Sequence, residues 1–85
     1  MEWTIEFSRT ALKDAKKLRA ANLDTNVKRL LTILKANPYQ PPYEKLTGNL
    51  QGYFSRRINL KHRLVYSVDH ATQTIKVISA WSHYE

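Results

Sequence analysis

The chain has 85 residues, enough for one modest hydrophobic core, so we expect residues 1–85 to form a single domain. It contains no cysteine, which excludes a disulfide framework, a zinc site with thiolate ligands and a cysteine nucleophile. Fourteen basic and seven acidic residues give a formal net charge of +7, which predicts a polyanionic partner: nucleic acid first, or an acidic protein as the alternative.

The chain opens with a predicted strand, because Trp3, Ile5 and Phe7 alternate with Thr4 and Glu6. The same stretch lacks the basic start and long apolar core of a signal peptide. No run anywhere reaches the roughly 18 apolar residues that a membrane span requires. We therefore expect a cytoplasmic protein without a membrane partner.

Two helices are predicted next. Ser8 is placed to cap the first helix, which carries many basic residues around a narrow apolar stripe. The second helix begins at Asn22 or Asp24 and should end at Asn37, because Pro38 disfavours helical geometry in the residue before it. Its apolar positions follow one helical face: Leu23, Val27, Leu30, Leu31 and Leu34. These helices predict a helical hairpin lying on one face of a sheet.

Residues 38–50 are polar and contain prolines, so we interpret them as an ordered loop. The restricted backbone of such a loop can hold the carboxylate of Glu44 at a reproducible position. The alternative is that Glu44 is an ordinary solvated carboxylate.

Residues 53–58 and 62–68 both have the aromatic and branched composition of strands, and their spacing predicts a hairpin. If its turn centres on Leu60, Arg57 lies directly opposite Arg63, with Cβ atoms about 5 Å apart. Opposed like charges destabilise a sheet unless an anion such as phosphate neutralises them. The alternative is a register shifted by one residue, which sends the two arginines to opposite faces.

Alternation along the first of these strands places Phe54 and Ile58 in the core and Tyr53, Ser55 and Arg57 on the open face. Arg56 points inward by the same rule, and nothing in the sequence explains a buried arginine there. A polar turn at 69–73 and a last strand at 74–83 complete the chain.

The predicted fold class is α+β, with two N-terminal helices packed on one face of a small antiparallel sheet and the order β-α-α-β-β-β. Short turns join the last three strands into a meander, so the first strand must join that sheet at an edge or at its centre.

No metal site is predicted, because His62, His70 and His83 have no carboxylate at ligand-like spacing. No nucleophile elbow or glycine-rich phosphate loop is present. The remaining glutamate, histidine, arginines and tyrosines suit RNA, which supplies its own 2′-hydroxyl nucleophile. Such an enzyme needs only a base, an acid and cations for the phosphorane, with tyrosine to stack on an unpaired base. For His83 alone, the alternative is a frayed terminus.

The chain resembles the YoeB and Txe toxins of bacterial toxin-antitoxin systems, within the RelE-like superfamily. The resemblance is carried by Glu44 and Leu46 before NLQGYFSRRI, by HRLVY at 62–66 and by the pair of residues His83 and Tyr84. It implies a RelE/YoeB-like fold and an mRNA interferase that cuts the codon exposed in the ribosomal A site. It implies no metal or other cofactor, and products with a 2′,3′-cyclic phosphate, or the 3′-phosphate formed when it opens, and a 5′-hydroxyl.

The resemblance also implies roles for single residues. Glu44 is the general base, His83 the general acid and Arg63 the transition-state stabiliser, while Arg57 contacts phosphate and Tyr84 helps to hold the substrate.

Three further residues, Arg56, Lys45 and Tyr53, complete the expected substrate-binding set. Family members can carry lysine at the position of Thr47, and here only the neighbouring Lys45 is available to replace it. Glu85 extends the chain beyond the usual His-Tyr end, which bears on how His83 is placed.

The partners implied are the ribosome, mRNA and an acidic antitoxin of the YefM or Axe type, with operator DNA reached only through the antitoxin. A homodimer is also expected as an alternative to a monomer. Two other functions stay open: a relative that poisons gyrase by binding, and a basic nucleic-acid-binding module for which charge alone is sufficient.

Overall fold

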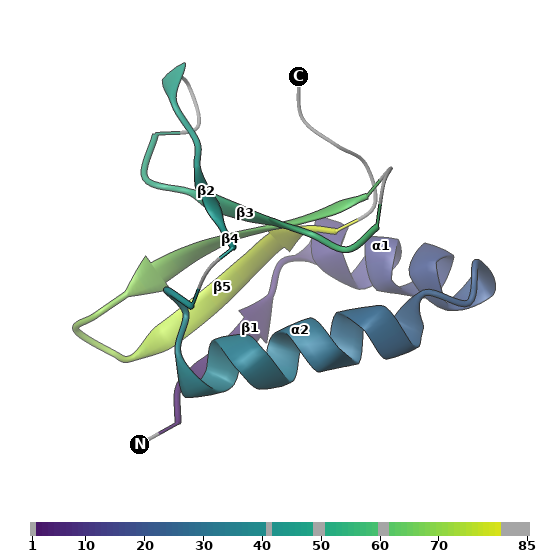
Figure 1. The fold of residues 1–85 in the computed structure, drawn as a ribbon, viewed down its shortest axis with the longest axis horizontal. Helices are drawn as coiled ribbons and strands as arrows, with labels where there is room; N and C mark the ends of the chain where they lie inside the picture. The colour runs from purple at the N-terminus through teal and green to yellow at the C-terminus, as the bar shows by residue number, and fades with distance from the viewer. Residues whose placement is uncertain (1, 41, 49–50, 60–61, 81–85) are drawn as a thin grey trace.

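The computed structural model describes residues 2–40, 42–48, 51–59 and 62–80, so the predicted site residues His83 and Tyr84 lie outside the described residues. Its elements are β1 (Thr4–Phe7), α1 (Arg9–Ala20), α2 (Asp24–Ala36), β2 (Glu44–Lys45), β3 (Phe54–Arg57), β4 (Arg63–Asp69) and β5 (Thr74–Ser79). Both helices lie on one side of the sheet (Figure 1), which confirms the α+β class.

Local sequence signals set the start of α1 and the end of α2. The Oγ atom of Ser8 accepts a hydrogen bond from the backbone amide of Ala11 at 3.0 Å, so the predicted N-cap of α1 is confirmed. Helix α2 stops at Ala36, and Asn37 is extended with φ −158° ahead of Pro38, as predicted. Between the helices Asn22 has φ +62°, a left-handed conformation that asparagine tolerates better than most residues.

The strand order is β1-β5-β4-β3-β2. All neighbours are antiparallel except β1, which pairs parallel with β5 so that Ile5 faces Ile75. The expected purely antiparallel sheet is therefore corrected to a mixed one. The predicted loop also contributes the short strand β2, which pairs with β3 and adds a fifth strand.

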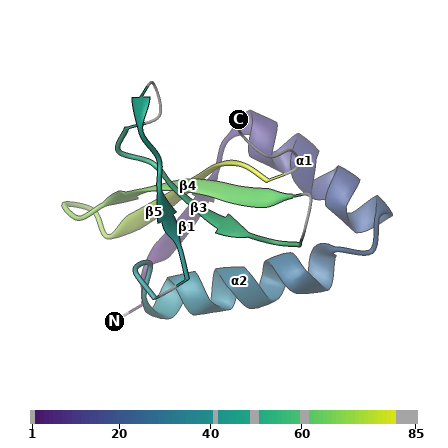
Figure 2. The ribbon, with the colours of Figure 1, turned by 45° about the horizontal axis from the view of Figure 1, so that its top comes forward.

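The parallel pairing follows from the connection between β1 and β5. A parallel pair needs a long crossover, and two helices and the meander separate these strands. The helical hairpin brings the chain back beside its own start, where the amide of Trp3 donates to the carbonyl of Lys35 at 2.9 Å. Figure 2 shows the end of α2 beside the beginning of β1.

The hairpin register is the one obtained by centring the turn on residue 60. Arg57 pairs with Arg63, and Ser55 pairs with Val65. The predicted opposition of the two arginines is confirmed, and the alternative register shifted by one residue is wrong.

The core lies between the helices and the sheet. Its fully buried members come from both layers: Leu18, Leu34, Leu64, Tyr66, Ile75 and Val77. Burying one leucine of this kind contributes about 1.5–3 kcal/mol. This packing uses the helix-facing side of the sheet, while the other side carries Arg57 and Arg63 together with the buried Ser55 and Val65.

Candidate active site

Glu44 and Arg63 form an ion pair on the side of the sheet away from the helices. The Nη1 atom of Arg63 donates to Oε2 of Glu44 at 2.9 Å, with side-chain exposures of 25% and 63%. Glu44 lies on β2 opposite Ser55, and Arg57, two residues further along β3, lies opposite Arg63. Because alternate residues of a strand share a face, Glu44, Arg57 and Arg63 lie on one face.

The guanidinium of Arg57 has no hydrogen-bond or ion-pair partner among the described residues. It is exposed, and Glu44 neutralises only its neighbour Arg63. Arg57 and Glu44 also line a cleft of about 350 Å³. The other residues that line it are Leu30, Pro42, Tyr43, Ser55 and Arg56. Because Leu30 belongs to α2, the cleft lies where the edge of the sheet at β2 and β3 meets that helix. An anion entering it meets the carboxylate of Glu44 and the exposed guanidinium of Arg57.

Arg56 points into the molecule, as alternation predicts, and the structure supplies the partner that the sequence did not reveal. Its side chain is buried, and Nη1 donates to the backbone carbonyl of Gln40. This contact holds the loop that leads to Glu44. Arg56 also belongs to the expected substrate-binding set, and it lines the same cleft as Glu44 and Arg57.

Tyr66 is a second anchor of the same loop and was missed by the sequence reasoning. Its hydroxyl donates to the carbonyl of Pro38 at 2.9 Å, and the residue is fully buried. Burial raises the pKa of Tyr66 to about 12, with the positive charge of Arg56 acting in the opposite direction. A tyrosine at a core position is the available signal, because a buried hydroxyl requires a partner.

The loop is also packed by aromatic rings. Tyr39 and Tyr43 both meet the ring of Phe54 edge-on, at centroid distances of 5.6 and 5.7 Å. The Tyr39 hydroxyl lies 2.7 Å from Nε2 of His70. Tyr39 and Tyr43 thus help to fix the backbone before Glu44.

Of the remaining predicted site residues, Lys45 pairs with Phe54 and is exposed. Alternation places it on the opposite face from Glu44. Tyr53 is half-buried, and its carbonyl accepts from the amide of Leu46 at 2.9 Å. The structure therefore brings together Glu44, Arg57 and Arg63.

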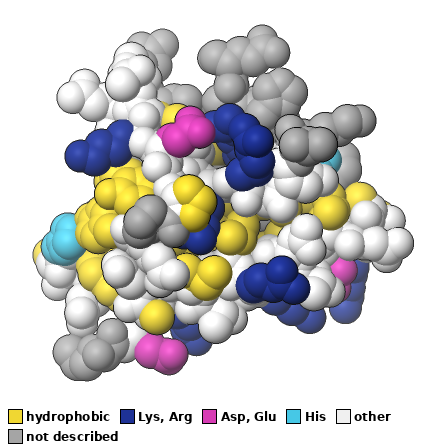
Figure 3. Space-filling view, viewed as in Figure 1, with side chains coloured by type: hydrophobic (Ala, Val, Ile, Leu, Met, Phe, Trp, Pro, Cys, Tyr) yellow, Lys and Arg dark blue, Asp and Glu magenta, His cyan; other side chains and the backbone are white. Residues whose placement is uncertain are grey.

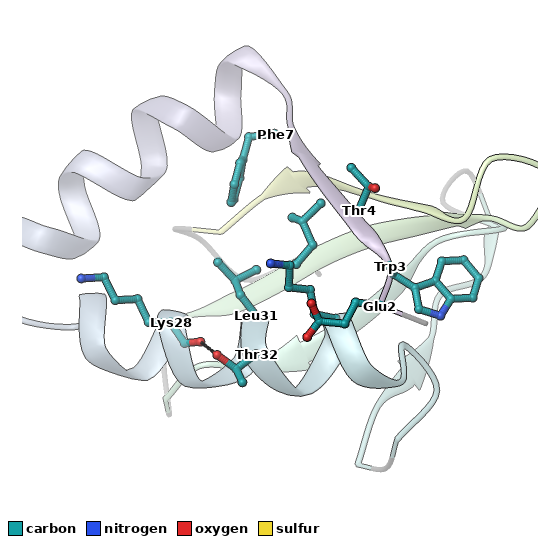
Figure 4. A pocket seen from close by; sticks show the side chains of 9 residues that line it. Glu2, Trp3, Thr4, Phe7, Lys28, Leu31 and Thr32 are labelled. Carbon is teal, nitrogen blue, oxygen red and sulfur yellow. Dashed lines mark hydrogen bonds between the residues drawn. The ribbon is translucent and has the colours of Figure 1, made fainter.

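A separate groove runs between β1 and α2 and has a volume of about 780 Å³. Its lining combines apolar and charged side chains: Glu2, Trp3, Thr4, Ile5, Phe7, Lys28, Leu31, Thr32 and Lys35. Figure 4 shows Phe7 and Leu31 pointing toward one another across it. Phe7 keeps 38% of its surface exposed. The groove follows the free edge of the sheet, because β1 is the terminal strand.

Basic side chains are spread over the face seen in Figure 3, with few acidic ones among them. Within the described part of the chain, no cluster of three His, Cys, Asp or Glu side chains is arranged to hold a metal ion. No described helix has the length and apolar character to cross a membrane.

A family model described as the YoeB-like toxin of bacterial type II toxin-antitoxin systems matches residues 7–84. The chain belongs to this family. Toxin YoeB from Synechocystis is 41% identical over 64 residues, which are 69% of this chain and 72% of that protein.

Solved structures of YoeB proteins have the same fold. YoeB in a YoeB-YefM complex from Staphylococcus aureus is 38% identical with a TM-score of 0.81, covering 99% of this chain and 100% of that one. The YoeB dimer from the same organism is 37% identical with a TM-score of 0.83 and the same coverage. This YoeB-like chain is thus a toxin of a toxin-antitoxin system.

Proposed function

We propose that this YoeB-like toxin is a ribosome-dependent mRNA endonuclease, which cleaves mRNA in the A site, in the cytoplasm, and so inhibits translation. The observation that carries the proposal is the arrangement of Glu44, Arg57 and Arg63 on one face, beside a cleft with a guanidinium free to bind phosphate.

The reaction needs no nucleophile from the protein. Glu44 removes the proton of a ribose 2′-hydroxyl, and the 2′-oxygen forms a bond to the adjacent phosphorus. Arg63 stabilises the negative charge of the phosphorane, and Arg57 holds the phosphate. As the bond from phosphorus to the 5′-oxygen breaks, His83 donates a proton to that oxygen. The products are a 2′,3′-cyclic phosphate and a 5′-hydroxyl.

The ribosome supplies what this small domain lacks. The cleft of about 350 Å³ is too small to hold a trinucleotide, so the chain does not enclose its substrate. Presentation of a bent codon in the A site provides the alignment for in-line attack, which is worth many kcal/mol in oriented reactions. Tyr84 holds the substrate beside the reacting phosphate, and Lys45 and Tyr53 contact RNA at the margins of the site.

An acidic antitoxin of the YefM type is the proposed partner. It is supported by the net charge of +7 and by the S. aureus homologue solved with YefM. The groove between β1 and α2 offers an apolar floor with Lys28 and Lys35 at its sides, which suits an acidic segment carrying apolar side chains. Operator DNA is reached through the antitoxin, and the S. aureus dimer supports a homodimer.

Mapping of mRNA ends after toxin induction tests the proposal. The wild type should produce cuts at fixed positions within codons, and Glu44→Gln or His83→Gln should lower cleavage by about 10²–10⁴-fold, the usual contribution of a general base or acid. Glu6→Gln, the same change at an exposed glutamate on β1, the opposite edge of the sheet from β2, is the matched control and should cut like the wild type.

Uncut mRNA with the wild-type toxin would exclude the endonuclease. If DNA topology were damaged at the same time, the gyrase-binding alternative would take its place.

A further inference from the structure

Asp14 is a buried carboxylate that the proposed chemistry does not use. It lies on α1 with 7% of its surface exposed. Its Oδ2 atom accepts a hydrogen bond from the backbone amide of Ala80 at 3.0 Å, across 66 residues of sequence. A buried carboxylate is costly unless it is hydrogen-bonded, so this contact fixes both partners.

Ala80 occupies a particular place in the chain. It directly follows Ser79, the last residue of β5, and is itself 3% exposed. His83 comes three residues later. Three residues of extended chain span at most about 10–11 Å. The position of the Ala80 amide therefore defines the region that the imidazole of His83 can reach.

Helix α1 is joined to β5 at a second, independent point. The Ser8 hydroxyl donates to the carbonyl of Ile78 at 2.6 Å, and the Ser8 amide donates to the carbonyl of Val77 at 2.9 Å. These contacts hold the strand itself. The Asp14 contact lies one residue past the end of the strand, so its side chain can be changed without changing the side chain of Ser8.

We propose that Asp14 is a positioning residue for His83: its carboxylate fixes the chain at Ala80 and thereby places the acid relative to Glu44 and Arg63. The inference rests on the proposed function, in which His83 protonates the leaving 5′-oxygen. A general acid must lie within hydrogen-bond reach of its target, and a misplacement of about 1 Å can cost about 10²-fold in rate.

The test compares two RNA substrates on programmed ribosomes. One is ordinary RNA, and the other carries sulfur in place of the 5′-bridging oxygen at the cleavage site. A thiol has a pKa of about 8.5, so the thiolate leaves without a proton and the acid is not needed. Asp14→Ala should cut ordinary RNA about 10- to 100-fold more slowly than the wild type and cut the sulfur substrate within about 3-fold of it.

Three variants serve as controls. His83→Gln should show the same rescue by sulfur. Asp14→Asn keeps an oxygen acceptor for the Ala80 amide and should restore most of the activity on ordinary RNA. Ser8→Ala removes the N-cap and the hydroxyl bond to Ile78 of the other anchor, so it should lower the melting temperature while leaving both rates close to those of the wild type.

A loss by Asp14→Ala that is equal on both substrates overturns the inference, as does an Asp14→Asn variant no better than Asp14→Ala. If Asp14→Ala is unfolded, Asp14→Leu fills the space without the acceptor and is judged in the same way. If His83→Gln cuts ordinary RNA like the wild type, the proposed acid is wrong. If His83→Gln behaves as expected and Asp14→Ala cuts like the wild type, only the positioning role is wrong.

Discussion

Arg63 has one positively charged and one negatively charged neighbour. It faces the like charge of Arg57 across the hairpin and is paired with the carboxylate of Glu44 at 2.9 Å. The ion pair offsets one of two adjacent positive charges and leaves the other. A surface arrangement of this kind contributes little to folding, because exposed pairs are worth about 0–1 kcal/mol. In the proposed reaction, the arrangement matters because it places two guanidinium groups beside Glu44, the proposed base.

Replacing Arg63 by alanine should therefore separate activity from stability. We expect Arg63→Ala to lose most mRNA cleavage, because charge on the phosphorane is no longer stabilised. Its free energy of unfolding should fall by no more than about 1 kcal/mol. Urea denaturation and cleavage assays on the same preparation check this. A large loss of stability would instead make Arg63 a structural residue.

The placement of some single residues could be predicted from the sequence, while the partners or burial of others could not. Counting across the turn was sufficient to place Arg57 opposite Arg63. Alternation gave the direction of Arg56 but not its partner, because the Gln40 carbonyl is brought there by the path of a loop. The burial of Asp14 had a signal that was not used. It stands three residues after Ala11 and four before Leu18, on the buried face of α1.

At the scale of elements, buried side chains of the sheet hold the segment before β2 in place. Arg56 of β3 binds the carbonyl of Gln40, and Tyr66 of β4 binds the carbonyl of Pro38. Two strands of the sheet thus fix the loop whose continuation carries Glu44. The position of the proposed base is a property of this assembly and does not depend on proline stiffness alone.

Tyr66→Phe should lower the free energy of unfolding by about 1–3 kcal/mol at neutral pH, because the carbonyl of Pro38 loses a buried donor. Alkaline pH gives a second readout. The folded-state pKa of about 12 lies above the ordinary value of 10.0, so the stabilisation is complete below pH 10 and is lost as the pH rises from 10 toward 12.

Urea denaturation of both proteins between pH 8 and pH 12 measures the effect. The stability difference between wild type and Tyr66→Phe should shrink by about 2–3 kcal/mol across this range, since each pKa unit corresponds to about 1.4 kcal/mol. Lysine titration affects both proteins equally and cancels. A difference that stays constant with pH would contradict the assignment.

The elements themselves were largely predictable, because capping and periodicity are local signals. Ser8 and Pro38 fixed the start of α1 and the end of α2. The parallel pairing of β1 with β5 and the existence of β2 were not. Both depend on contacts between distant segments, and a strand of two residues has too short a pattern to recognise.

At the scale of the whole molecule, the net charge of +7 is large for 10.0 kDa, and basic side chains are spread over the face seen in Figure 3. Such a charge accelerates encounters with RNA or with an acidic antitoxin without selecting a sequence. Under the proposed function, selection of a codon is left to the small site at Glu44, Arg57 and Arg63 and to the ribosome that presents the RNA.

This division predicts a strong dependence of RNA binding on salt. Affinity for a non-cleavable 2′-deoxy oligonucleotide, measured by fluorescence anisotropy, should fall at least about 10-fold between about 50 and 200 mM salt. The combined change Lys13→Ala and Lys16→Ala on α1 should reduce the slope, since each lost phosphate contact lowers it by about 0.7 for a single strand. Affinity independent of salt would show that charge does not drive binding.

The pairing of β1 with β5 also determines when, during synthesis, the toxin can fold and become active. Residues 4–7 are synthesised well before their strand partners at 74–77. Closing so long a stretch of chain is slow and cannot precede synthesis of its far end. A nascent chain in which β5 has not yet been made therefore lacks the sheet edge and the anchor of α1 at Ala80. We expect toxicity to begin only once β5 has been synthesised and paired with β1, which gives an antitoxin already present an early opportunity to bind.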